Sequence, residues 1–224
     1  MKEISHSSNK TVRFQDGGKG QTAYFPIVCL GSSAGGLTPC LRIIEKLPSD
    51  LGLAIVLVRH GGRQKYFAEI VRQHADMPVQ CIRQGLEVEP RYVYITPPDC
   101  TLVISNSRFQ LNRQAKPYGW SDVITICLKS LAKSWPGSVV AVILSGLAAD
   151  GVTALQVVKA AGGITIAQQV ETAHYPDMPL NAIKSGFVDY VLPPAAIARA
   201  LVKIARSSAR ARNQAEQVNS PLGS

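Results

Sequence analysis

The stretch "YFPIVCLGSSAGGLTPCLRIIEKL", residues 24–47, combines the two patterns that decide the fold. Residues 24–30 form a short apolar run rich in strand-forming residues, which predicts a buried strand. Residues 37–47 place their leucine and isoleucine side chains on one face of a helix. A second apolar run, 53–58, and a second helical pattern, 63–75, follow directly. Strand, helix, strand and helix in this order are typical of βαβ units and a parallel sheet.

The rest of the chain returns to this alternation after one interruption. Between residues 91 and 112, short strand-like runs are separated by the turn sequences "PPD" and "NS", which indicates a hairpin-rich insertion. The sequence therefore predicts an α/β fold: a doubly wound, mostly parallel sheet with helices on both faces and a small antiparallel hairpin insertion. The further elements that we expect are helices at 121–135, 151–163, 179–186 and 193–207, and strands at 138–145, 164–168 and 188–192.

Composition and charge set the domain boundaries. The chain has 224 residues, of which 46% are hydrophobic and 17% charged, which is enough for one large domain. We expect a flexible N-terminal extension over 1–22, one globular domain over 23–206, and a disordered polar and basic tail over 207–224. Much of the net charge of +9 lies in the two end segments, so it indicates solvated tails rather than a nucleic-acid site.

Other features of the sequence exclude several classes of protein. No apolar run approaches the roughly 18 residues that a membrane span needs. The polar beginning "MKEISHSSNK" is unlike a secretion signal. The five cysteines are odd in number and form no C-x-x-C pair, so we expect reduced packing residues in a cytoplasmic protein and no metal site.

The segment "GSSAGG", residues 31–36, admits three interpretations: a phosphate cradle, a nucleophile turn or a plain connection. A dinucleotide cradle is disfavoured, because Ser33 stands where the second glycine belongs and no acidic residue ends the next strand. The segment matches G-x-S-x-G, which places Ser33 rather than Ser32 at the apex of a tight strand-to-helix turn. The following amide, of Ala34, lies where a helix begins and could donate to an oxyanion. A tight turn without chemistry stays open at this point.

Two other strand ends carry side chains that fit serine chemistry, and strand ends are where doubly wound sheets bind ligands. His60 directly follows the second strand and could take a proton from a serine hydroxyl. Asp150 follows the strongly apolar strand 138–145 and could orient the imidazole. The alternatives are a structural histidine and an aspartate that caps helix 151–163. The order serine, histidine, aspartate differs from that of the α/β-hydrolases, in which the acid precedes the histidine.

With these residues in place, the sequence resembles the catalytic domain of the chemotaxis protein-glutamate methylesterases, the CheB family. The resemblance rests on "VCLGSSAGGL", "VLVRHGG", "YVYITPPD", "VILSGLAADGVTAL" and "AQQVETAHYPDMPLNAIKSGFVDYVLPP", in this order. It implies a doubly wound parallel sheet and a catalytic triad that needs no cofactor. The site residues that it implies are Ser33, His60 and Asp150 as the triad, the amides of Ala34 and Leu147 as oxyanion donors, and Met178 near the substrate groove.

The resemblance also implies a reaction and a partner. The reaction is hydrolysis of γ-glutamyl methyl esters on the cytoplasmic helices of chemoreceptors, with release of methanol, and in many members also deamidation of receptor glutamines. The expected partner is therefore a methylated chemoreceptor, with no nucleic acid and no membrane insertion.

Two departures from the family pattern stand beside this resemblance. Residues 1–24 are too short for the receiver domain that the family usually carries, so no attached receiver is expected. Gly61 follows His60 where many members have a bulkier residue. Two other functions remain as alternatives: a serine esterase or amidase with another substrate, and a non-catalytic module that binds a partner in a signalling complex.

Overall fold

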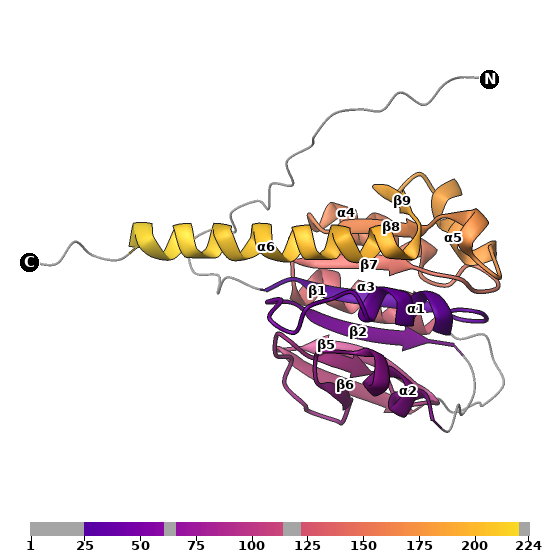
Figure 1. The fold of residues 1–224 in the computed structure, drawn as a ribbon, viewed down its shortest axis with the longest axis horizontal. Coiled ribbons are helices and arrows are strands. Elements are labelled where there is room, and N and C mark those ends of the chain that lie inside the picture. The colour runs from indigo at the N-terminus through magenta and orange to yellow at the C-terminus, as the bar shows by residue number, and fades with distance from the viewer. Residues whose placement is uncertain (1–24, 61–65, 114–121, 220–224) are drawn as a thin grey trace, which may run out of the picture.

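The computed structural model describes residues 25–60, 66–113 and 122–219 of the chain. In these residues, seven strands form one parallel sheet in the order β3-β4-β2-β1-β7-β8-β9, and β5 and β6 form a separate antiparallel hairpin (Figure 1). The strands are β1 (Ile27–Ser32), β2 (Ala54–Arg59), β3 (Val79–Cys81), β4 (Val93–Ile95), β5 (Cys100–Ser105), β6 (Arg108–Arg113), β7 (Val139–Ile143), β8 (Ile164–Gln168) and β9 (Tyr190–Leu192). The helices are α1 (Leu37–Ile44), α2 (Phe67–His74), α3 (Val123–Ser134), α4 (Val152–Ala160), the 3-10 helix η1 (Val170–Thr172), α5 (Asp177–Lys184) and α6 (Pro194–Asn219).

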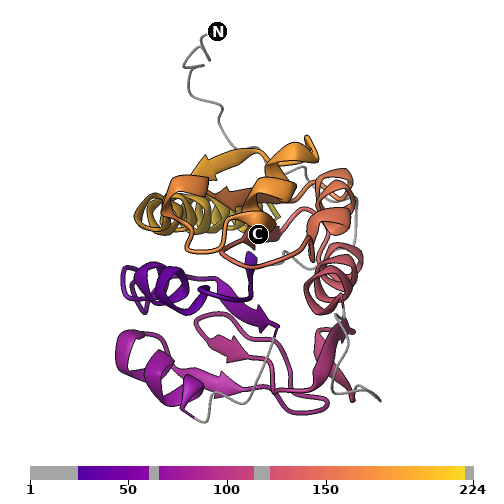
Figure 2. The ribbon, with the colours of Figure 1, turned by 90° about the vertical axis from the view of Figure 1, so that its right-hand side faces the viewer.

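Helices cover both faces of the parallel sheet (Figure 2). Along β1, Ile27 and Cys29 pack into one hydrophobic cluster and Val28 and Leu30 into the other, and all four side chains are fully buried. The first cluster includes side chains of α3, α4, α5 and the β5–β6 hairpin, and the second includes side chains of α1, α2 and α6. Burial on both faces is the reason why the central strands are continuous apolar runs in the sequence.

The strand order reverses beside β1. From β1 the chain runs to β2, β3 and β4 on one side, and after α3 it returns as β7 on the other side of β1. Because the seven strands are parallel, their carboxyl ends lie at one edge of the sheet. The segments that follow β1 and β7 therefore meet at the switch point, where doubly wound sheets bind ligands. The predicted fold class is confirmed.

Two strands of the sheet differ from the prediction. Residues 91–96 were expected in the hairpin insertion, but β4 lies inside the parallel sheet between β2 and β3. The strand β3 was not expected, because it has three residues and none of them is buried. The insertion consists of β5 and β6, which pack on α3. There the Oγ of Ser130 accepts from the amide of Ile104, and the Oγ of Ser134 donates to its carbonyl.

The C-terminal helix is longer than the sequence suggested. The expected disordered tail, 207–224, is wrong for residues 207–219, because α6 continues to Asn219. The expected extension 1–22 and residues 220–224 lie outside the described residues. Among the helices of the described ranges, α6 included, none combines the length and the apolar character that crossing a membrane requires.

All five cysteines are free thiols. Cys29, Cys40 and Cys127 are buried packing residues, whereas Cys81 is exposed at the edge of the sheet. Burial raises the pKa of the Cys40 thiol to about 11, so this thiol stays protonated and unreactive at neutral pH.

Candidate active site

The turn after β1, residues 33–36, is held in a sharp conformation by two glycines. The amide of Gly36 donates to the carbonyl of Ser33 at 3.0 Å, and Gly35 has φ of +69°, as the third residue of a type II turn requires. A side chain at Gly36 would overlap Ser32, so only glycine fits there. The helix α1 begins directly after the turn, at Leu37. We call residues 33–36 the nucleophile turn.

Ser32 points away from the surface, toward α1 and α2. It is 4% exposed, and its Oγ accepts a hydrogen bond from the Sγ of Cys40 at 3.8 Å. The β1–β2 register pairs Ser32 with Arg59, whose guanidinium lies over the ring of Phe67 at 4.4 Å. The hydroxyl of Ser32 therefore belongs to the packed layer on that side of the sheet.

Ser33 comes one residue later and is partly exposed. The β1–β2 register ends at Ser32 and Arg59, which Ser33 and His60 directly follow, and the amide of His60 donates to the carbonyl of Ser32 at 3.1 Å. Side chains alternate between the faces of a sheet, so Ser33 and His60 fall on the face that α3 covers. Neighbouring strands lie about 4.8 Å apart, a separation that a hydrogen bond between two side chains can bridge.

His60 and Asp150 are joined directly. The Nε2 of His60 and the Oδ2 of Asp150 lie 2.5 Å apart, and the two side chains are 14% and 6% exposed. One residue follows β2 and the other lies in the segment between β7 and α4, 90 positions later in the chain. The sequence singled out the ends of three strands, and the structure joins the residues that follow two of them, β2 and β7. The end of β1, which Ser33 follows, lies between these two strands.

The first turn of α3 holds the carboxylate of Asp150 in place. The amide of Ile124 donates to Oδ2 at 2.8 Å, and the amide of Thr125 donates to Oδ1 at 2.9 Å. Burial by itself would raise the pKa of Asp150, but the hydrogen bonds from His60, Ile124 and Thr125 outweigh it and hold the pKa below its ordinary value. The carboxylate is therefore charged at neutral pH.

Asp150 does not cap helix α4, which was the alternative role that the sequence left open. The N-cap of α4 is Gly151, in a left-handed conformation with φ of +88°. Asp150 instead satisfies amides at the start of α3, a different helix, where the helix dipole also favours a negative charge.

The segment between β7 and α4, residues 144–151, is fastened to the start of α5. The amide of Gly146 donates to the carbonyl of Tyr175, and the carbonyl of Gly146 accepts from the amide of Met178, both at 3.0 Å. Asn181 donates from Nδ2 to the carbonyl of Ala148, which has a left-handed φ of +67°. We call residues 144–151 the aspartate loop.

Met178 supports the aspartate loop from inside the protein. The sequence placed it near a substrate groove, but its side chain is fully buried. A Cβ on Gly146 would overlap its sulfur, and the same Cβ would lie 2.8 Å from the Cβ of Ser33. Met178 therefore packs beneath the aspartate loop and lines no exposed surface.

The sequence singled out two backbone amides as candidate oxyanion donors. Within the part of the chain that the structure describes, neither the amide of Ala34 nor that of Leu147 donates to a protein acceptor. The peptide that carries the Leu147 amide has its oxygen, that of Gly146, bound to Met178, so the N–H points the other way. Donors that the fold leaves unpaired beside a nucleophile can stabilise a negative oxygen there.

Sequence reasoning missed three polar residues that build the site. Thr125 accepts from the amide of Gly151 at 2.8 Å, in addition to holding Asp150. Ser145 and Gln168 are fully buried and hydrogen-bonded to each other, the Ser145 amide to the Gln168 Oε1 at 2.9 Å. Ser145 and Gln168 are the last residues of two predicted strands, so the signal that singled out His60 could have found both of them.

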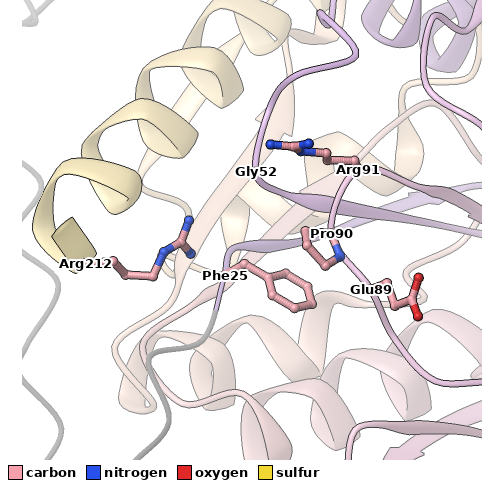
Figure 3. A pocket seen from close by; sticks show the side chains of 6 residues that line it. All are labelled: Phe25, Gly52, Glu89, Pro90, Arg91 and Arg212. Carbon is pink, nitrogen blue, oxygen red and sulfur yellow. The ribbon is translucent and has the colours of Figure 1, made fainter. Parts of the chain in front are cut away.

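A pocket of about 490 Å³ lies elsewhere, at the amino ends of β1, β2 and β4. Figure 3 shows that Arg212 reaches it from α6, while Pro90 and Arg91 come from the segment before β4. None of the candidate catalytic residues lines this pocket, whose lining residues are Phe25, Gly52, Glu89, Pro90, Arg91 and Arg212.

The fold and the site together define a doubly wound α/β protein with a partly buried histidine–aspartate pair next to a serine at the switch point. The family model "CheB methylesterase" matches residues 28–201, and the chain belongs to this family. The solved structure of the Thermotoga maritima CheB methylesterase catalytic domain is 33% identical and superimposes with a TM-score of 0.73, over 81% of this chain and 99% of that one.

Longer relatives carry the name protein-glutamate methylesterase/protein-glutamine glutaminase. Protein-glutamate methylesterase/protein-glutamine glutaminase 1 from Syntrophus aciditrophicus is 32% identical over 191 residues. The match covers 84% of this chain and 55% of the relative. The one from Thermotoga maritima is 33% identical over 184 residues, or 80% of this chain and 54% of the relative. The chain thus spans about half the length of the relatives that it matches.

Proposed function

We propose that this protein is a serine hydrolase that cleaves γ-glutamyl methyl esters on the cytoplasmic helices of chemoreceptors, and also deamidates receptor glutamines. Its relatives are named for these two activities. The observation that carries the proposal is the His60–Asp150 pair at 2.5 Å, in which His60 directly follows the strand next to the one that the partly exposed Ser33 follows. A charged, hydrogen-bonded carboxylate against an imidazole is the arrangement that activates a serine for acyl transfer.

In the first step, the Oγ of Ser33 attacks the carbonyl carbon of the ester. His60 takes the hydroxyl proton as the new C–O bond forms, and Asp150 stabilises the resulting imidazolium. Because Nε2 faces Asp150, the proton goes to the other ring nitrogen, Nδ1. The amides of Ala34 and Leu147 bind the carbonyl oxygen while it is negative, a contribution of about 3 kcal/mol for one such donor.

The tetrahedral intermediate then expels methoxide, which takes its proton from His60 and leaves as methanol. Water then attacks the glutamyl ester on Ser33, with His60 again as the base. This step releases the glutamate carboxylate and regenerates the serine hydroxyl. A glutamine side chain follows the same course, with ammonia leaving in place of methanol.

The direct test is methanol release from methylated chemoreceptor preparations, with the wild type compared with Ser33→Ala. We expect release by the wild type and none above background by the variant, with both proteins equally stable, because Ser33 lies on a partly exposed turn. Full activity in Ser33→Ala would refute the assignment of the nucleophile.

Two other functions would have different outcomes in a second assay. A fluorophosphonate probe reacts with activated serines whatever their substrate. Labelling at Ser33 without methanol release would favour an esterase or amidase that acts on another substrate. A folded protein that neither labels nor releases methanol would favour a non-catalytic module that binds a partner.

A further inference from the structure

We infer that Ser145, which lies in the aspartate loop, is a positioning residue that fixes the nucleophile turn relative to that loop. The inference rests on the proposed function and concerns how its site is held together. Ser145 follows the last residues of β7 and is fully buried, so its side chain does not touch substrate. Its carbonyl and hydroxyl bind the nucleophile turn, and the same hydroxyl binds Tyr175, to which the aspartate loop is also hydrogen-bonded.

The backbone and the hydroxyl of Ser145 hydrogen-bond to the nucleophile turn at two peptides that have one other peptide between them. The carbonyl of Ser145 accepts from the amide of Ser33 at 3.0 Å, and its Oγ donates to the carbonyl of Ala34 at 2.9 Å. The peptide that carries the Ala34 amide lies between these two anchored peptides. Ser145 therefore fixes the direction of the Ala34 amide, one candidate oxyanion donor, and the position of the Ser33 backbone beside it.

The same hydroxyl also bonds to Tyr175, in the segment before α5 to which the aspartate loop is fastened. The Oγ of Ser145 accepts from the amide of Tyr175 at 3.0 Å, while the carbonyl of Tyr175 accepts from the amide of Gly146 at 3.0 Å. Gly146 directly precedes Leu147, the second candidate oxyanion donor. One buried hydroxyl thus links the nucleophile turn, which carries one candidate oxyanion donor, to Tyr175, which is bonded to the loop that carries the other donor.

Gln168 keeps Ser145 from adopting another arrangement. Its Oε1 accepts from the amide of Ser145 at 2.9 Å, and its Nε2 donates to the carbonyl of Thr172 at 2.8 Å. All the polar groups of Ser145 are therefore bonded. Buried polar groups that are fully satisfied specify a single geometry, because each alternative leaves a donor or an acceptor unpaired.

The test compares Ser145→Ala with the wild type in two assays, the second-order rate of fluorophosphonate labelling at Ser33 and the kcat and KM of methanol release. We expect the labelling rate and kcat of Ser145→Ala to fall by about tenfold to a hundredfold, because small misplacements of reacting groups cost that much. The KM should stay within about twofold, because the buried hydroxyl touches no substrate. Ser145→Thr, which keeps a hydroxyl, should recover most of the lost rate.

Ser208→Ala is the matched control. Ser208 is also a buried serine, on α6, but its hydroxyl has no hydrogen-bond partner within the described residues. Its removal should leave both rates unchanged. If Ser145→Ala does not fold, Ser145→Cys tests the same bonds, since a thiol fills the site but bonds weakly, and it should lose rate in the same direction.

Two results would overturn the inference: a wild-type kcat in the folded Ser145→Ala or Ser145→Cys variant, or a Ser145→Thr variant as slow as Ser145→Ala. Failure of the proposed function gives a different result. In that case the wild type itself would neither be labelled at Ser33 nor release methanol.

Discussion

Replacing Asp150 by asparagine isolates the charge of the carboxylate from its shape. The asparagine is isosteric, and its oxygen can still accept from the amide of Thr125. Its Nδ2 then stands where Oδ2 was, against the amide of Ile124 and the Nε2 of His60. Since Nδ2 can only donate, neutral His60 must accept at Nε2 and carry its proton on Nδ1, the nitrogen that we propose as the base for Ser33.

The size of the effect on rate follows from the lost charge. Two unit charges about 4 Å apart interact by about 4 kcal/mol at an effective dielectric constant of about 20. This attraction stabilises the imidazolium that forms in the transition state, and about 1.4 kcal/mol corresponds to a tenfold change in rate. We therefore expect the kcat of methanol release to fall about a thousandfold in Asp150→Asn.

The same change should also lower stability. A donor facing the amide of Ile124 leaves a buried group unpaired, which costs about 1–3 kcal/mol in the free energy of unfolding. Urea denaturation measures this loss. The control is Asp122→Asn, which removes an exposed carboxylate at the start of α3 that makes no side-chain capping bond. A kcat of Asp150→Asn within about threefold of the wild type would refute the role of the carboxylate, because triad members act as a unit.

Three further variants test the site and the fold. Ser32→Ala should keep methanol release within about threefold of the wild type, since the bond that its hydroxyl makes within the described residues is a weak one from a thiol; a loss as large as that of Ser33→Ala would mean that the two serines are wrongly assigned. Gly146→Ala should lose about 1–3 kcal/mol in urea denaturation and most of its activity, because the new Cβ would lie 2.8 Å from the Cβ of Ser33; wild-type kcat would contradict this packing. Burial would raise the pKa of Asp189, but its bonds, to Lys159 first, hold that pKa below its ordinary value. Its contribution to stability is therefore present above the pKa of the unfolded state, about 3.9, and lost as pH falls through the lower pKa of the folded state. Asp189→Asn should be less stable than the wild type at pH 7, with the difference shrinking at the acid end of a denaturation series; a difference independent of pH would contradict the shift.

The central part of the fold could be predicted from the sequence because its strands are buried on both faces. Such strands are apolar throughout and end abruptly, as β1, β2 and β7 do. The edge of the sheet was harder to predict. The three residues of β3 are too few and too polar to stand out, and β4 alternates like a hairpin strand although its partners lie in the parallel sheet.

The helical extent of α6 was missed for a different reason. Residues 207–219 are polar, a composition that suggested disorder. They are nevertheless rich in alanine, arginine and glutamine, which favour helices. The buried residues Ile197, Leu201 and Ile204 anchor the first turns, and adding residues to an existing helix needs no new nucleus.

Within the site, the alternation of side chains along β1 and β2 separates the proposed reacting groups from the supporting ones. Ser32 and Arg59 fall on one face, against the layer of α1 and α2, and Ser33 and His60 fall on the other. A shift of one residue in either strand would exchange these roles. The alternation of side chains along the strand and the point where the strand ends can both be predicted from the sequence. Together they distinguish Ser33 from Ser32.

The partners of Asp150 and Ser145 could not be predicted in the same way. Asp150 is held by the first turn of α3, 25 positions earlier in the chain, and Ser145 binds the nucleophile turn across 111 positions. Such contacts depend on how the helices pack on the sheet, about which local periodicity says nothing. The rule that found His60, a polar residue at the end of a buried strand, also applies to Ser145 and Gln168. Burial then separates their roles: the partly exposed Ser33 can meet a substrate, whereas the fully buried Ser145 and Gln168 can act only through the backbone that they hold.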